Sequence, residues 1–136
     1  MSVYSAQCQC GALRLNATVD PDMVVVCSCK FCQRRTGSPF GAAGYFSRDA
    51  ISTTGEYRTW SRISDAGRDI TNHFCPTCGS TLWWTLELKP DLIGVAVGTV
   101  DQPLPRPVRA VWAEAAHDWV AYPDDFTVFP KGSTGT

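Results

Sequence analysis

Residues 75–79 read CPTCG, and this pentapeptide is typical of a zinc knuckle, a tight turn in which Cys75 and Cys78 bind one metal ion. Gly79 allows the backbone to double back, so that backbone N–H groups point at the two sulfur atoms. A knuckle supplies only half of a tetrahedral metal site. We therefore expect two further ligands from another part of the chain.

The other half of this site lies near the start of the chain, where residues 8–11 read CQCG. Together Cys8, Cys10, Cys75 and Cys78 offer a closed set of four thiolates, which is typical of a structural zinc site. A metal ion held in this way closes a loop of about 65 residues. The alternative for these four cysteines is a set of buried free thiols or a disulfide.

The remaining three cysteines form a cluster in residues 27–32, which read CSCKFC. Cys27, Cys29 and Cys32 supply three thiolates from one loop, and the total of seven cysteines leaves no eighth to complete the set. Three protein ligands with an open fourth position are typical of a catalytic zinc site. The sequence therefore predicts two zinc ions per chain, one structural and one catalytic.

The two histidines of the chain leave another interpretation of this cluster open, namely a second structural zinc site with histidine as its fourth ligand. His73 lies two residues before Cys75, so we expect it near the other site. His117 fits a ligand, an acid/base group or a surface residue, and the surface role is the simplest. A redox-active group of neighbouring thiols is a third interpretation.

Basic side chains accompany the same loop, because Lys30, Arg34 and Arg35 lie within it or shortly after it. They can offset the negative charge of the thiolates or bind the carboxylates of an acidic substrate. For the two arginines a solvated face is the more usual role, and an anion-binding role is the other. All three are candidate substrate-binding residues.

Composition and charge restrict the classes of partner. The 136 residues fit one domain, and 12 basic against 13 acidic residues give a net charge of −1. No excess of positive charge would attract nucleic acid or an anionic membrane. The N-terminus lacks the features of a secretory signal, and the longest nearly apolar run, residues 92–100, is too short to span a bilayer as a helix. We expect a cytoplasmic protein, in which reduced thiols favour metal binding over disulfides.

Turn-forming residues interrupt the chain at short intervals and separate segments rich in β-branched and aromatic residues, which predicts a mainly β, antiparallel, single-domain fold. One helical turn is expected at Phe31 to Arg35, and the tryptophans at positions 83, 84 and 112 are expected in the core. Residues 131–136 are expected to form a flexible tail after a domain of residues 1–130. Strands are expected at Gly11–Val19, Met23–Cys27, Ala42–Phe46, Tyr57–Arg62, Ile70–Phe74, Thr81–Leu86, Leu92–Val97 and Arg109–Trp112.

The three cysteine motifs carry a family resemblance. With CQCGA at residues 8–12, CSCKFC followed by Gly37, and HFCPTCG at residues 73–79, the sequence resembles the glutathione-dependent formaldehyde-activating enzyme family, which includes the centromere protein V type of domain. The resemblance covers roughly residues 4–101. It implies a β-tent of short antiparallel sheets organised around zinc. It also implies a structural zinc at Cys8, Cys10, Cys75 and Cys78, and a catalytic zinc at Cys27, Cys29 and Cys32.

The activity that the resemblance implies is carbon–sulfur lyase chemistry, in which glutathione and formaldehyde form S-(hydroxymethyl)glutathione. The expected partner is a small-molecule thiol such as glutathione or its aldehyde adduct, with no nucleic acid and no membrane. An open zinc site suits this chemistry, since zinc lowers the pKa of a bound thiol or polarises an aldehyde oxygen. The alternative function is a non-catalytic, zinc-stabilised module that binds a protein. A zinc-ribbon nucleic-acid binder is disfavoured because it needs a basic surface.

Overall fold

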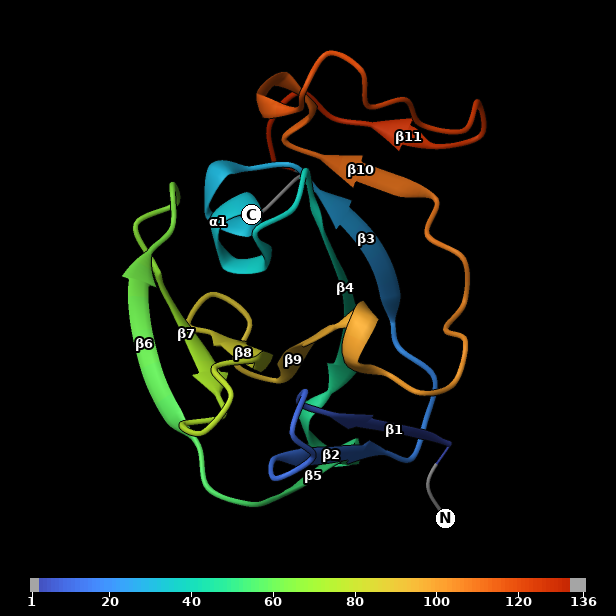
Figure 1. The fold of residues 1–136 in the computed structure, drawn as a ribbon. Coiled ribbons are helices and arrows are strands. Elements are labelled where there is room, and N and C mark those ends of the chain that lie inside the picture. Colours follow the sequence, from blue (N-terminus) through green and yellow to red (C-terminus); the bar gives the residue numbers. More distant parts are fainter. Residues whose placement is uncertain (1–2, 133–136) are drawn as a thin grey trace.

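Two β-sheets and one short α-helix make up the computed structural model of the protein, which describes residues 3–132 (Figure 1). The smaller sheet is antiparallel and contains β1 (Tyr4–Gln7), β2 (Arg14–Ala17) and β5 (Ile51–Thr54) in that order. The larger sheet has eight strands in the described part of the chain. In spatial order they are β11 (Thr127–Val128), β10 (Arg109–Val111), β3 (Met23–Cys27), β4 (Gly41–Ser47), β9 (Leu92–Ala96), β8 (Thr81–Leu86), β7 (Asp69–Phe74) and β6 (Arg58–Ile63).

Helical structure is confined to short segments. The α-helix α1 (Lys30–Thr36) begins at its N-cap Cys29 and ends at Gly37, whose φ of 64° is left-handed. Among residues 3–132, no helix has the length and apolar character needed to cross a membrane. The described residues also contain three 3-10 turns: η1 (Arg48–Ala50), η2 (Val97–Thr99) and η3 (Ala113–Ala115).

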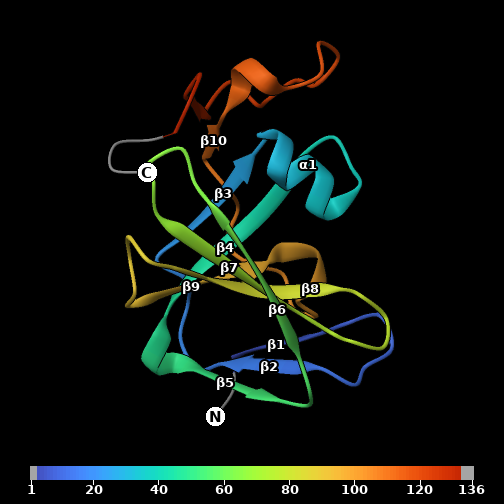
Figure 2. The ribbon, with the colours of Figure 1, turned by 90° about the vertical axis from the view of Figure 1, so that its left-hand side faces the viewer.

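The main hydrophobic core lies between the small sheet and one face of the large sheet. Leu13, in the turn before β2, and Leu15, on β2, enter it from the small sheet. Three residues enter it from the large sheet: Phe46, Leu82 and Val95. All five are buried. In Figure 2 the small sheet lies directly below β8 and β9. This packing ties the N-terminal hairpin to the middle of the chain.

The other face of the large sheet carries a second apolar cluster. Neighbouring residues of a strand point to opposite faces. Phe46 and Trp83 therefore belong to the main core, whereas the adjacent Tyr45 and Trp84 belong to the second cluster. This second face lies toward α1 (Figure 1).

The predicted mainly β, single-domain fold is confirmed, and each of the eight expected strands overlaps an observed one. The strand expected to begin at Gly11 begins at Arg14 instead, because residues 11–13 form the turn after the first cysteine pair. The expected helical turn is α1. The sequence did not predict β1, β5 and β11, which have two to four residues and are rich in polar side chains.

The expectation of antiparallel pairing is wrong at β10, which pairs in parallel with both β3 and β11. After η2 the chain crosses residues 101–108 outside any strand and reaches β3 running in the same direction as that strand. Prolines at positions 103, 105 and 107 have no N–H to offer a sheet, so this segment stays a connection.

The chain end is described in part. The carbonyl of Lys131 accepts a hydrogen bond from the N–H of Trp112 at 3.0 Å, so the first residue of the expected tail is held against the domain. Residues 133–136 lie outside the described residues. Their expected flexibility, and the domain boundary at residue 130, stay predictions.

Candidate metal centres and the cavity beside them

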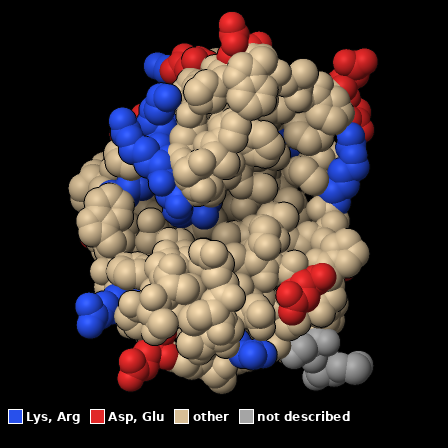
Figure 3. Space-filling view, in the orientation of Figure 1, with Lys and Arg blue, Asp and Glu red and all other residues tan. Residues whose placement is uncertain are grey.

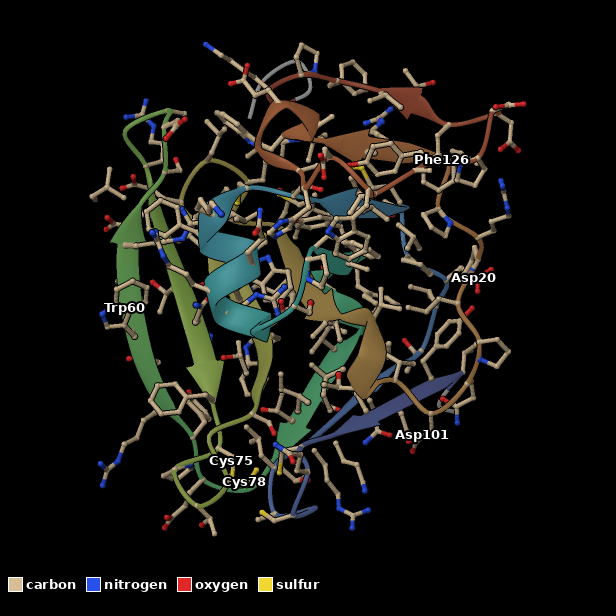
Figure 4. The ribbon with its side chains drawn as sticks, turned by 45° about the horizontal axis from the view of Figure 1, so that its top comes forward. Asp20, Trp60, Cys75, Cys78, Asp101 and Phe126 are labelled. Atoms are coloured by element: carbon tan, nitrogen blue, oxygen red, sulfur yellow. The ribbon has the colours of Figure 1, made fainter. Side chains whose placement is uncertain are left out.

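The first cysteine group joins two turns that are far apart in the sequence. Cys8 and Cys10 follow β1, and Cys75 and Cys78 lie between β7 and β8 (Figure 4). All four Sγ atoms lie within 4.8 Å of one another, and the Cys8–Cys10 and Cys10–Cys75 Sγ distances are both 3.7 Å. Four thiolates at 2.3 Å from one zinc ion would stand about 3.8 Å apart. The donor set therefore fits zinc.

Backbone groups support thiolates at this site. The N–H of Leu13 donates to Cys8 Sγ at 3.3 Å, and the N–H of Thr77 donates to Cys75 Sγ at 3.4 Å. Hydrogen bonds with the side chain and backbone of Ser80 lower the pKa of Cys78 to about 5. Such bonds orient the sulfurs and favour the charged form that binds metal.

The second cysteine group gathers at the start of α1. Cys27 is the last residue of β3, Cys29 caps the helix, and Cys32 lies in the first helical turn. The N–H of Cys32 donates to Cys29 Sγ at 3.3 Å. The three Sγ atoms lie within 4.8 Å of one another, so the structure brings together the three residues predicted for the open site.

Neither histidine joins these thiols. Within residues 3–132, no histidine, aspartate or glutamate completes either cysteine group to a larger set of ligands. His73 is stacked on Trp83 with ring centroids 4.7 Å apart, and burial lowers its pKa. The Nε2 of His117 lies 3.1 Å from Gln33 Oε1. The three-thiol group therefore offers three protein ligands and an open side.

Each of the three thiols changes the pKa of its neighbours. Hydrogen bonds from Cys27 and Cys32 lower the pKa of Cys29, and the charge of Arg62 lowers it further. The hydrogen bond with Cys29 in turn raises the pKa of Cys27. A lowered pKa at Cys29 favours its thiolate, which is the form that binds a metal ion.

The open side of this group faces a cavity of about 430 Å³ between α1, the β6–β7 hairpin and the large sheet. Figure 3 shows the hollow and the basic side chains at its margin. Of the three candidate substrate-binding residues, Lys30 and Arg35 line it, whereas the exposed Arg34 does not. The remaining basic residues of the lining were not predicted: Arg62, Arg68, Lys89 and Arg109.

Arg62 lies close to the thiols although it is distant from them in the sequence. Its guanidinium stands 4.1 Å from the centre of the Phe31 ring, which links strand β6 to helix α1. The alternation of β6 indicates which of its residues share a face, but only the pairing of β6 with β7 brings Arg62 to α1. No local signal in the sequence identifies it.

Tyr45 is a second residue of the cavity that the sequence did not single out. Burial raises its pKa to about 12, with a hydrogen bond from Trp84 acting in the opposite direction. The nearby thiols Cys32 and Cys27 raise it further. Tyr45 therefore keeps its proton at physiological pH and can donate a hydrogen bond in the cavity.

A buried glutamine holds the cysteine loop against the C-terminal segment. Gln33 Nε2 donates to the carbonyl of Ser28 at 2.7 Å and to that of Ala115 at 3.0 Å. Its Oε1 faces His117 Nε2 at 3.1 Å. The buried Ser28 hydroxyl also bonds to the Tyr122 hydroxyl at 3.0 Å. The loop of the three thiols is thus fixed by residues more than 80 positions away.

Comparison with known proteins agrees with this arrangement. A family model described as glutathione-dependent formaldehyde-activating enzyme matches residues 3–121. The chain belongs to this family. The resemblance carried by the cysteine motifs is thereby confirmed, and the two cysteine groups described above lie within the matched residues.

Two relatives from fungi share part of the chain. An uncharacterized lyase of Schizosaccharomyces pombe is 29% identical over 84 residues, which are 62% of this chain and 58% of that protein. A Penicillium rubens protein, named for the glutathione-dependent formaldehyde-activating enzymes, is 29% identical over 83 residues, 60% of this chain and 43% of its own. The chain spans about half the length of these relatives.

A solved structure shares the fold. A crystal structure of a Rhodobacter sphaeroides protein superposes with a TM-score of 0.59 at 21% identity, covering 75% of this chain and 92% of that one. At this identity the likeness concerns the fold alone.

Proposed function

We propose that the protein is a zinc-dependent carbon–sulfur lyase that makes and breaks the bond between the sulfur of a thiol such as glutathione and an aldehyde carbon. The observation that carries this proposal is the group of Cys27, Cys29 and Cys32, which finds no fourth protein ligand among residues 3–132 and opens into a cavity with more basic than acidic lining residues. The family membership and the lyase relative support a lyase-type activity. The seven free thiols suit a reducing compartment such as the cytoplasm.

Two zinc ions per chain are part of the proposal. The four-thiol group would hold the structural ion, and Cys27, Cys29 and Cys32 would hold the other with one position left for substrate. A zinc ion bound there would lower the pKa of a substrate thiol or polarise an aldehyde oxygen.

The basic residues around the thiols would bind the substrate's carboxylates. Lys30, Arg35 and Arg62 all line the cavity, and Arg35 and Arg62 carry planar guanidinium groups that suit two-point contacts with a carboxylate. Arg34 does not line the cavity, so Arg62 takes its place among the proposed contacts. These contacts would orient the thiol with its sulfur toward the cysteine group.

The reaction needs little rearrangement of atoms. The thiol sulfur adds to the carbonyl carbon and forms a C–S bond, while the C=O double bond becomes a C–O single bond. The proton lost by the thiol ends on the oxygen. The reverse reaction splits the adduct. Negative charge develops on the oxygen during addition, and a hydrogen bond donated by Tyr45 would stabilise it.

Exchange spectroscopy tests the activity. We expect the protein, purified without chelator, to accelerate the exchange between an aldehyde and its glutathione adduct, followed by NMR with formaldehyde, hexanal and benzaldehyde in turn. The Cys29→Ser variant is the matched control and should give the uncatalysed rate. Absence of any acceleration with all three aldehydes would overturn the proposed function, as would a three-thiol group that binds no metal.

A further inference from the structure

The floor of the cavity is a hydrophobic cluster with one uncovered side. Its buried members are Val25, Ala43, Trp84 and Ala96. Partly buried side chains lie against them and reach the cavity: Tyr45, Ile70, Leu86 and Val111. A cluster of this kind is normally closed by another layer of protein. Here the cavity lies where that layer would be.

Strand pairing explains why the floor is continuous. Tyr45, Gly94, Trp84 and Asn72 stand side by side on β4, β9, β8 and β7. The indole of Trp84 lies across Gly94, so a Cβ at position 94 would collide with Trp84 Nε1. The glycine therefore allows one flat aromatic surface to cover two strands.

The apolar floor extends away from the thiols. Cys27 ends β3 and Met23 begins it, so the two are about 13 Å apart along the strand. Near the Met23 end, Leu92 and Leu88 also line the cavity, and Leu88 is 42% exposed. A small adduct at the thiols would leave this apolar surface in contact with water.

Most charged side chains of the cavity lie at its margin rather than on its apolar floor. The basic residues come from the helix, the hairpin and the strand ends, and the acidic residues of the lining are Asp65, Asp69 and Glu114. Figure 3 shows basic side chains at the margin of a hollow whose interior is mostly uncharged. The polar groups of the floor are the Tyr45 hydroxyl, the Asn72 amide and the Trp84 indole N–H, and the Arg35 guanidinium lies over the Trp84 ring beside α1. Glutathione, with two carboxylates and two amides, matches the margin but not the floor.

We infer that the aldehyde partner of the reaction is a bulky apolar aldehyde, alkyl or aryl, rather than formaldehyde. This inference rests on the proposed function. The thiol component lies at the basic margin, and the apolar group carried by the aldehyde carbon covers the floor beyond Trp84, at Ile70, Leu86 and Leu88. The bonds made and broken are those of the proposed reaction, and the product is the hemithioacetal of the larger aldehyde.

Calorimetry with two stable thioethers tests this inference on the protein purified without chelator. S-hexylglutathione and S-methylglutathione differ by five methylenes, and each buried methylene increases affinity about fourfold. We expect S-hexylglutathione to bind at least about tenfold more tightly, since only part of the chain is fully buried. Hexanal or benzaldehyde should also exchange with glutathione faster than formaldehyde does, relative to the uncatalysed rates.

Matched variants test whether the tighter binding of S-hexylglutathione comes from the apolar floor. Leu88→Ser changes a partly exposed residue of the floor and should reduce the advantage of S-hexylglutathione while leaving S-methylglutathione unchanged. Leu86→Ser gives a second test at a more buried position. Ile63→Ser, on the same hairpin as Ile70 but outside the cavity lining, should change neither affinity.

The outcomes separate this inference from the proposed function. Equal affinities for the two thioethers, together with accelerated formaldehyde exchange, would overturn the inference and leave the proposed function standing. An advantage of S-hexylglutathione that survives both leucine substitutions would also overturn it. If neither thioether binds and no aldehyde exchange is accelerated, the proposed function fails and the inference fails with it.

Discussion

The guanidinium of Arg35 stands 4.3 Å from the centre of the Trp84 ring, and this contact places a positive charge between helix α1 and the floor of the cavity. A Cβ at position 41 would lie 2.7 Å from Arg35 Nη2, so Gly41 keeps the space that the guanidinium needs. Arg35 is therefore held by an aromatic face on one side and by backbone on the other. A cation fixed in this way loses little entropy when it binds an anion.

We expect Arg35→Met to raise KM for glutathione roughly tenfold or more, because a hydrogen bond to a charged group contributes about 1.5–3 kcal/mol. The Met side chain keeps most of the apolar contact with Trp84, so the melting temperature should change little. Steady-state kinetics of adduct exchange measure the effect. Arg34→Met is the matched control on the same helix and should leave KM unchanged; an equal effect of both substitutions would contradict the proposed contact.

The two cysteine groups should differ in what they do for the fold. Cys78→Ser removes a ligand of the four-thiol group that joins the N-terminal turn to the β7–β8 turn, and we expect a marked fall in melting temperature. Cys29→Ser should keep the fold, because Gln33 and Ser28 still fix the loop, but abolish exchange activity. Thermal unfolding and metal content per chain measure both variants. Equal destabilisation would favour the non-catalytic, protein-binding module.

Chelation should reveal the same difference in the unmodified protein. The three-thiol group has an open side toward the cavity, so EDTA should remove its metal first. We expect two zinc ions per chain by elemental mass spectrometry, loss of activity when the first is removed, and loss of structure only with the second. Circular dichroism recorded beside metal content checks the order. Unfolding that accompanies the first ion lost would contradict it.

Gln33 should position the three thiols. Gln33→Leu leaves the carbonyls of Ser28 and Ala115 without their hydrogen-bond donor, which costs about 1–3 kcal/mol in the free energy of unfolding. Because Cys29 and Cys32 belong to the same helix start, the geometry of a bound metal should change too. Cobalt-substituted protein reports this geometry through its visible absorption bands.

Two controls separate positioning from stability for Gln33. Arg34→Ala changes the neighbouring, exposed residue and should leave both the unfolding energy and the cobalt spectrum unchanged. Gln33→Glu keeps an acceptor for His117 but loses both donated hydrogen bonds, so its cobalt spectrum should resemble that of Gln33→Leu. A normal spectrum in both Gln33 variants would show that the residue has no positioning role.

The sequence predicted the parts of this site that depend on short-range spacing. The motifs around Cys8, Cys27 and Cys75 gave the division into four and three thiols, since each turn brings its own sulfurs together. Residues that reach the cavity through strand pairing had no such signal. Arg62 arrives there because β6 pairs with β7, and Tyr45 because β4 lies beside β9.

Long-range polar contacts escaped prediction for the same reason. In the sequence Gln33 has the features of an ordinary helix residue. Its role depends on Ala115 and His117, which the C-terminal segment brings against it. The parallel pairing of β10 with β3 has the same origin, since it depends on the path of residues 101–108 rather than on the strand's own composition. Periodicity reports burial within an element, and it does not report which element lies opposite.

Tyr45 provides the sharpest test of the proposed chemistry. Tyr45→Phe removes one oxygen and keeps the ring that packs in the apolar cluster. If the hydroxyl stabilises charge on the aldehyde oxygen during addition, kcat/KM should fall roughly 100-fold, as for the loss of one such donor in other enzymes. The affinity for S-hexylglutathione should stay the same, because this thioether has no oxygen at the reacting carbon.

Because burial raises the pKa of Tyr45 to about 12, the donor stays protonated, and the wild-type rate should show no loss from its ionisation below about pH 11. Tyr57→Phe, at an exposed tyrosine outside the cavity lining, is the control and should leave the rate unchanged. A Tyr45→Phe variant with the wild-type rate would exclude the hydroxyl from the reaction, whereas a parallel loss of rate and thioether affinity would indicate a role in shaping the cavity.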